Sequence, residues 1–66
     1  MLLDVTLRRD GQTRRWTIHM SSVDWTCIVE APGHVESSAC STRDLALAKA
    51  GEWQQEITAA RAAGWA

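Results

Sequence analysis

Apolar and polar side chains alternate through most of the first twenty residues, which is the period of a strand buried on one face. The alternation covers about residues 2–9 and resumes over about 14–20. We therefore predict two strands, each with one apolar side. The apolar positions are Met1, Leu3, Val5, Leu7, Trp16, Ile18 and Met20.

The Asp10-Gly11 pair between the two runs predicts a tight hairpin, because a type I′ turn needs positive φ at both central residues. With these two residues at the centre of the turn, the apolar sides of both runs fall on one face of the hairpin. Turn chemistry and periodicity thus predict the same register. The predicted pairs are Arg9–Gln12, Leu7–Arg14, Val5–Trp16, Leu3–Ile18 and Met1–Met20.

A third alternating run, over about residues 24–30, predicts a third strand after a loop of about four residues. A Pro-Gly pair then marks a turn at 32–33. The segment 35–40 is either a fourth, weaker strand or irregular chain. If it is a strand, a three-residue Pro-Gly-His loop would place Ala31 opposite Val35 and turn Val35 and every second residue after it toward the core.

An alanine-rich run over about residues 42–63 predicts an α-helix. Ser41 and Asp44 have the spacing of a capping box at its start, and Gly64 is a plausible C-cap. The chain is therefore predicted to be an α+β domain, in which an antiparallel β-meander of three to four strands packs on one C-terminal α-helix. The helix stripe expected to face the sheet is Ala46, Ala50, Trp53, Ile57 and Ala60.

All four aromatic residues of the chain are tryptophans. We expect Trp16, Trp25 and Trp53 to form the centre of the core, because they lie on the apolar sides of the predicted strands and helix. Trp65 follows the end of the helix and is expected outside the main core, against a sheet edge or in a dimer contact.

Length and charge limit the classes of function. A chain of 66 residues suffices for one domain, 1–66, with one small core. Its formal net charge of −1 disfavours bulk attraction to nucleic acid, so such a role would need a local basic patch. The first residues carry charge and lack a long apolar run, so we expect no signal peptide, no membrane span and a cytoplasmic location.

Four arginines surround the predicted hairpin turn. The register places Arg8 and Arg15 on the face opposite the apolar one. Arg9 flanks the turn, and Arg14 lies at the rim of the apolar face. They form either the solvated tip of a hairpin or a set of phosphate contacts. The candidate residues for binding a partner or nucleic acid are Arg8, Arg9, Arg14, Arg15, Thr17 and His19.

The sheet face that the helix leaves uncovered is the surface most available for binding. It is polar enough to be simply solvated, but Leu2 and Ile28 are apolar residues on it, which hints that another chain covers part of it. We expect this face to present Thr6, Arg8, Arg15, Thr17, His19, Thr26, Ile28 and Glu36.

The side chains that could bind metal or perform catalysis form no recognisable motif. Two histidines and two cysteines include suitable zinc ligands, but no CxxC or HxxxH spacing occurs, so we expect no metal and no cofactor. Strand alternation turns Cys27 toward the core and Cys40 away from it, which opposes a disulfide. Since no nucleophile and base share an expected pocket, we predict no catalytic residues and no enzyme activity.

A resemblance to known families rests on the spacing of six residues in the second half of the chain, namely Ser41, Thr42, Ala46, Trp53, Ile57 and Gly64. In this spacing the segment 25–64 resembles the arm-binding domains of phage tyrosine integrases and the DNA-binding domain of plant ethylene-response factors. The resemblance implies a three-stranded sheet that reads the major groove of DNA. Those domains are strongly basic, whereas this chain is not.

A second resemblance rests on Pro32-Gly33, Val35 and Thr42. Their order is similar to the HicB-type antitoxin fold, with a longer gap before the helix, and implies a partner toxin and an oligomer. As a whole, the chain is most similar to small bacterial proteins.

The combined patterns favour a non-enzymatic interaction module that binds a protein partner, or a second copy of itself, through the helix-free face of the sheet. The alternative is a nucleic-acid-binding module in which the hairpin arginines contact phosphates.

Overall fold

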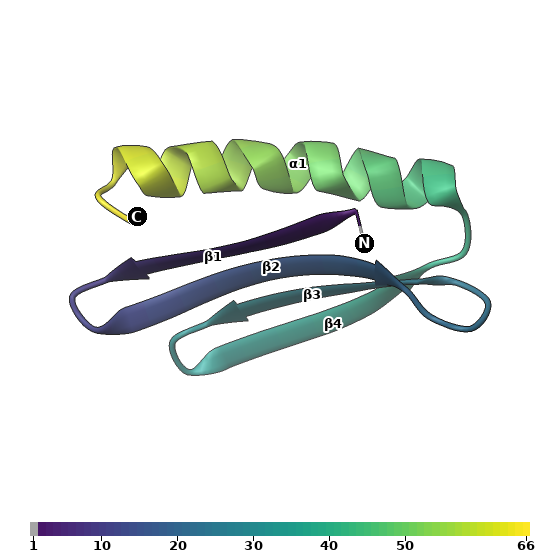
Figure 1. Ribbon diagram of the computed structural model, residues 1–66, viewed down its shortest axis with the longest axis horizontal. Helices are drawn as coiled ribbons and strands as arrows, with labels where there is room; N and C mark the ends of the chain where they lie inside the picture. The colour runs from purple at the N-terminus through teal and green to yellow at the C-terminus, as the bar shows by residue number, and fades with distance from the viewer. Residues whose placement is uncertain (1) are drawn as a thin grey trace.

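The computed structural model describes residues 2–66 as a four-stranded antiparallel sheet with one helix across one face (Figure 1). The strands lie side by side in sequence order, so the predicted α+β meander with a C-terminal helix is confirmed, and the fourth strand is present. The elements are β1 (Leu3–Arg9), β2 (Gln12–Met20), β3 (Trp25–Ala31), β4 (His34–Cys40) and α1 (Arg43–Ala62).

The β1–β2 hairpin has the turn and the register that the sequence predicts. Asp10 and Gly11 have φ values of 52° and 75°, as a type I′ turn requires. Met1, in the predicted pair Met1–Met20, lies outside the described residues. The four other predicted pairs are all present: Arg9–Gln12, Leu7–Arg14, Val5–Trp16 and Leu3–Ile18.

The connection from β2 to β3 is the predicted four-residue loop, 21–24. Ser21 closes it, since its backbone N–H donates to the Asp24 carbonyl oxygen at 2.8 Å and its hydroxyl donates to an Asp24 carboxylate oxygen at 2.8 Å.

The β3–β4 turn is one residue shorter than predicted. Ala31 pairs with His34, not with Val35, across a two-residue loop in which Gly33 has a φ of 72°. Proline followed by a residue with positive φ is typical of a type II turn. Because side chains alternate along a strand, this one-residue difference reverses every β4 side chain relative to the prediction.

The N-cap of α1 lies one residue later than predicted. The Thr42 hydroxyl accepts a hydrogen bond from the Leu45 backbone N–H at 3.2 Å, so Thr42, and not Ser41, is the N-cap. Leu45 then occupies the third helical position, where a capping box would have a glutamate or glutamine.

The end of α1 is a Schellman motif. Gly64, just after the cap residue Ala63, has a φ of 97°. The Gly64 N–H donates to the Arg61 carbonyl oxygen at 3.1 Å, and the Trp65 N–H donates to the Ala60 carbonyl oxygen at 3.0 Å. This geometry reverses the chain and points it back toward the sheet.

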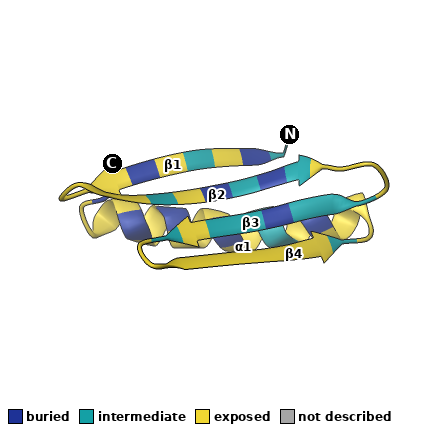
Figure 2. Cartoon of the chain, turned by 90° about the horizontal axis from the view of Figure 1, so that it is seen from below, coloured by how far each residue is buried: buried dark blue, intermediate teal, exposed yellow. Residues whose placement is uncertain are grey.

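The core lies between α1 and the sheet, and Figure 2 shows its dark buried positions on β1, β2, β3 and α1 but not on β4. The predicted helix stripe is confirmed, with Ala50 partly buried and the other four members buried. Trp16 and Trp53 are central as expected, whereas Trp25 is only half-buried. The buried residues are Leu3, Leu7, Trp16, Ile18, Cys27, Ala46, Trp53, Ile57, Ala60 and Trp65.

Trp65 belongs to the core, so the expectation that it lies outside was wrong. It is only 8% exposed. The next residue, Ala66, exchanges two backbone hydrogen bonds with Arg8, at 2.9 and 3.0 Å. The C-terminal residues therefore fold back onto the outer edge of β1, which was one of the two placements predicted for Trp65.

Candidate functional site

The arginines of the first hairpin do not form one binding surface. Arg9 lies at the end of α1, where its guanidinium donates to the Ala63 carbonyl oxygen at 2.7 Å and stands 5.0 Å from the centre of the Trp65 ring. Arg14 lies over the rings of Trp16 and Trp65, at 4.9 and 5.4 Å. These two candidates are engaged in holding the C-terminus against the sheet.

The other two arginines project from the helix-free face. Arg15 forms an ion pair with Asp4, with 3.2 Å between Nε and Oδ1, and Glu30 stands opposite it on β3. Arg8 is exposed at the end of β1. Since two acidic residues neighbour Arg15, the positive field that phosphate binding would use is largely cancelled.

Thr17 and His19 also lie on the helix-free face, half-buried among neighbouring strands. Thr17 stands between Asp4 and Ile28, and His19 is opposite Thr26. The structure thus places four of the six candidates on this face, where Arg8 and Arg15 are diagonal neighbours on the β1–β2 hairpin and His19 lies farther along β2.

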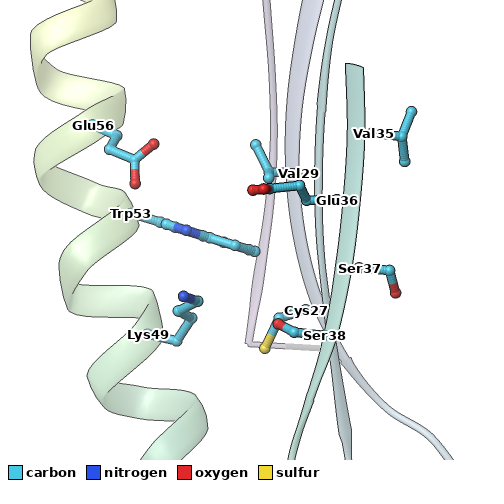
Figure 3. Close-up of a pocket in the computed structure, with 9 residues that line it drawn as sticks. All are labelled: Cys27, Val29, Val35, Glu36, Ser37, Ser38, Lys49, Trp53 and Glu56. Carbon is cyan, nitrogen blue, oxygen red and sulfur yellow. The ribbon is translucent and has the colours of Figure 1, made fainter.

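The β4 side of this face differs from the prediction. Figure 3 shows Glu36 and Ser38 directed toward the helix and Val35 and Ser37 directed away from it. The assignment of Glu36 to the helix-free face was therefore wrong, because the shorter turn reverses the strand. The corrected outer positions of β4 are Val35, Ser37 and Ala39.

This reversal leaves an area on the helix-free face whose β4 positions carry no charge, bordered by Glu30, which stands opposite Val35; we call it the β3–β4 face. Its three β4 members are exposed, and Val35 is 66% exposed. Sequence reasoning placed these three residues toward the core, because it assumed a turn one residue longer. The members of the β3–β4 face are Thr17, Thr26, Ile28, Val35, Ser37 and Ala39.

The two edges of the sheet are unequal. At the β1 edge, Ala66 pairs with Arg8. Within residues 2–66, no strand lies beyond β4, whose residues are exposed apart from half-buried Cys40 (Figure 2). The only side chains of β4 that can carry charge, His34 and Glu36, are directed to the helix side. The outer side of this edge has none of the lysines, prolines or bulges that usually discourage strand addition.

The opposite side of β4 faces an open groove beneath α1, with a volume of about 610 Å³ (Figure 3). Lys49 lies 5.6 Å from the centre of the Trp53 ring and 3.7 Å from Glu52. Glu36 and Glu56 also line the groove. Among residues 2–66, no serine or cysteine of this groove is hydrogen-bonded to a histidine or a carboxylate, so the groove shows no activated nucleophile.

Cys27 and Cys40 lie close together, in contrast to the sequence prediction. Their sulfur atoms are 3.5 Å apart. Cys40 was expected to point away from the core, and the reversed β4 turns it to the same side as Cys27. Across the described residues, no group of three His, Cys, Asp or Glu side chains is arranged to hold a metal ion.

Two further findings concern the described part of the chain as a whole. No helix within residues 2–66 combines the length and the apolar character needed to cross a membrane.

Comparisons with protein-family models, with curated proteins and with solved structures find no match to this chain.

Proposed function

We propose that this chain is a non-enzymatic protein-interaction module, and that its partner is a second copy that pairs with the β4 edge. The observation that carries the proposal is that the two edges of the sheet differ. Ala66 pairs with Arg8 at the β1 edge, whereas no strand within residues 2–66 pairs with the outer edge of β4. A strand that presents unpaired N–H and C=O groups is a template for another strand.

The alternating direction of the backbone hydrogen-bonding groups along β4 supports this role. In a two-residue loop the flanking residues, Ala31 and His34, form a hydrogen-bonded pair, and such pairs alternate along an antiparallel ladder. The backbone groups of Val35, Ser37 and Ala39 therefore point out of the sheet. The same three residues belong to the β3–β4 face, so one incoming strand would contact both the edge and this face, with Glu30 at its border.

The sequence of β4 is compatible with antiparallel pairing to itself. With Ser37 on a two-fold axis, Val35 would oppose Ala39 of the other copy, and Glu36 would oppose Ser38. This register places no like charges directly opposite each other, which would destabilise the pair. A symmetric pairing of this kind closes as a dimer and leaves no growing end.

The charge arrangement supports a protein partner over nucleic acid. Arg9 and Arg14 are engaged with the C-terminus, and Arg15 is paired with Asp4. The net charge of −1 adds no general attraction to phosphates. The cytoplasmic location stays a prediction from the sequence.

The test is the oligomeric state of the purified chain, measured by light scattering and sedimentation over a range of concentrations. We expect a monomer–dimer equilibrium for the wild type. Ser37→Pro should abolish the dimer, because it removes an outward N–H while sparing the β3–β4 ladder. Ser37→Thr keeps that N–H and is the matched control, which should still dimerise. Circular dichroism and urea titration establish that both variants fold.

Three outcomes would contradict the proposal. A wild type that stays monomeric at every concentration removes the second copy as partner. A Ser37→Pro variant that folds and still dimerises shows that another surface is used. Salt-dependent retention of random duplex DNA that Arg8→Glu weakens would favour the nucleic-acid alternative.

A further inference from the structure

Cys27 and Cys40 are diagonal neighbours on the helix side of the β3–β4 hairpin. Cys27 stands opposite Ser38, and Cys40 stands opposite Trp25, so the two cysteines are two pairs apart along the ladder, with Thr26–Ala39 between them. Their sulfur atoms are 3.5 Å apart and form a thiol hydrogen bond. A disulfide has a bond of about 2.05 Å, so the sulfurs would need to approach by about 1.5 Å.

The two thiols differ in accessibility. Cys27 is 1% exposed, at the inner wall of the groove beneath α1, whereas Cys40 is half-buried at the end of β4. Burial, reinforced by the neighbouring Cys40, raises the pKa of the Cys27 thiol to about 11. A reagent from solution therefore meets Cys40 first, and Cys27 is held as a neutral thiol directly behind it.

The surroundings favour chemistry between the two sulfurs over metal binding. Within residues 2–66, no third histidine, cysteine or carboxylate joins the pair at a distance suited to a metal ion. Both thiols are free in the structure.

We propose that Cys27 and Cys40 form a dithiol–disulfide couple that exchanges with low-molecular-weight disulfides. The thiolate of Cys40 attacks one sulfur of the small disulfide, forms a mixed disulfide and releases one small thiolate. That thiolate accepts the Cys27 proton. Cys27 then attacks the Cys40 sulfur, breaks the mixed disulfide and releases the second thiolate, which takes the proton that Cys40 lost. The two protein thiols are oxidised, and the small disulfide is reduced to two thiols.

The product would be a covalent link between β3 and β4. It would join the exposed edge strand to the strand that packs under α1, and would so restrict the opening of β4. The couple does not depend on dimer formation, because both sulfurs belong to one chain.

The experiment treats the reduced protein with oxidised glutathione and then alkylates it under denaturing conditions for intact-mass analysis. We expect the wild type to lose the mass of two hydrogens and to resist alkylation. Cys27→Ser should instead retain one glutathionyl group on Cys40. Cys40→Ser should react many times more slowly, because only the buried thiol remains. The oxidised wild type should also have a higher urea midpoint than the reduced protein.

The Ser37→Pro variant separates this test from the test of the proposed function. If the variant is monomeric and still forms the internal disulfide, the dithiol–disulfide proposal is supported independently of whether the wild type dimerises. Accumulation of a stable mixed disulfide in the wild type, formation of interchain disulfides only, or two thiols that stay fully alkylatable would each overturn the proposal.

Discussion

Replacement of Trp65 by alanine tests whether the C-terminal residues are part of the folded core. Trp65 is 8% exposed and has the guanidinium groups of Arg9 and Arg14 at 5.0 and 5.4 Å from its ring. Truncation of a buried tryptophan typically costs about 3–5 kcal/mol. Each arginine contact adds roughly 0.5–1 kcal/mol at partly exposed sites. We therefore expect Trp65→Ala to lower the free energy of unfolding by about 4–7 kcal/mol.

This loss is large for a domain of 66 residues, whose total stability is expected to be roughly 3–10 kcal/mol. The assay is urea unfolding followed by far-ultraviolet circular dichroism, which does not depend on the fluorescence of the residue removed. Leu47→Ala, at a helix position that is 41% exposed, is the control and should cost less than about 1 kcal/mol. A Trp65→Ala midpoint equal to that of Leu47→Ala would refute the placement of Trp65 in the core.

Three further predictions concern single residues. Arg9→Ala should cost about 1–2 kcal/mol in urea unfolding, because it removes the hydrogen bond to Ala63 and the contact with Trp65; an unchanged midpoint would show that both contacts are dispensable. Gly51→Ala should raise the free energy of unfolding by up to about 1 kcal/mol, since a Cβ there meets no atom within 4 Å and alanine favours the helix. A lower urea midpoint would show that the added methyl group is not accommodated. The raised pKa of Cys27, about 11 against an ordinary 9.0, means that the folded state holds this proton more tightly than the unfolded state. The stabilisation of the folded state by this tighter proton binding is complete below about pH 9 and should be lost as the pH rises toward 11. Urea midpoints should therefore fall over that interval, and should fall less in Cys27→Ala.

The first hairpin and the helix stripe could be predicted because their signals are local and independent. The Asp10-Gly11 turn fixes a register, and the apolar alternation of both flanking strands requires the same one. The stripe from Ala46 to Ala60 needs only helical periodicity and a sheet to face.

The direction of the β4 side chains could not be predicted from the same kind of signal. A loop of two residues and one of three are both compatible with Pro32-Gly33, and the two loops place opposite sides of β4 on the core. The strand itself is exposed along nearly its whole length, so it has no strong apolar side that selects between them. The pairing of Ala31 with His34 shows that the structure has the two-residue loop.

The engagement of Arg9 and Arg14 was missed for a different reason. It joins residues from the first hairpin to Trp65 at the other end of the chain, and no local pattern reports such a contact. A signal for Trp65 was nevertheless present. A large apolar residue directly after a helix-ending glycine is typical of the Schellman motif, in which that residue packs back on the last turn.

Both proposals depend on the length of one turn. With two residues between Ala31 and His34, Cys40 lies on the same side of the sheet as Cys27, and Ser37 lies on the open side with its backbone N–H directed outward. With three residues, Cys40 would point to the open face and Glu36 would place a charge among the residues that a second strand would contact. The β3–β4 turn therefore determines at once whether the thiols can meet and whether the exposed edge is uncharged.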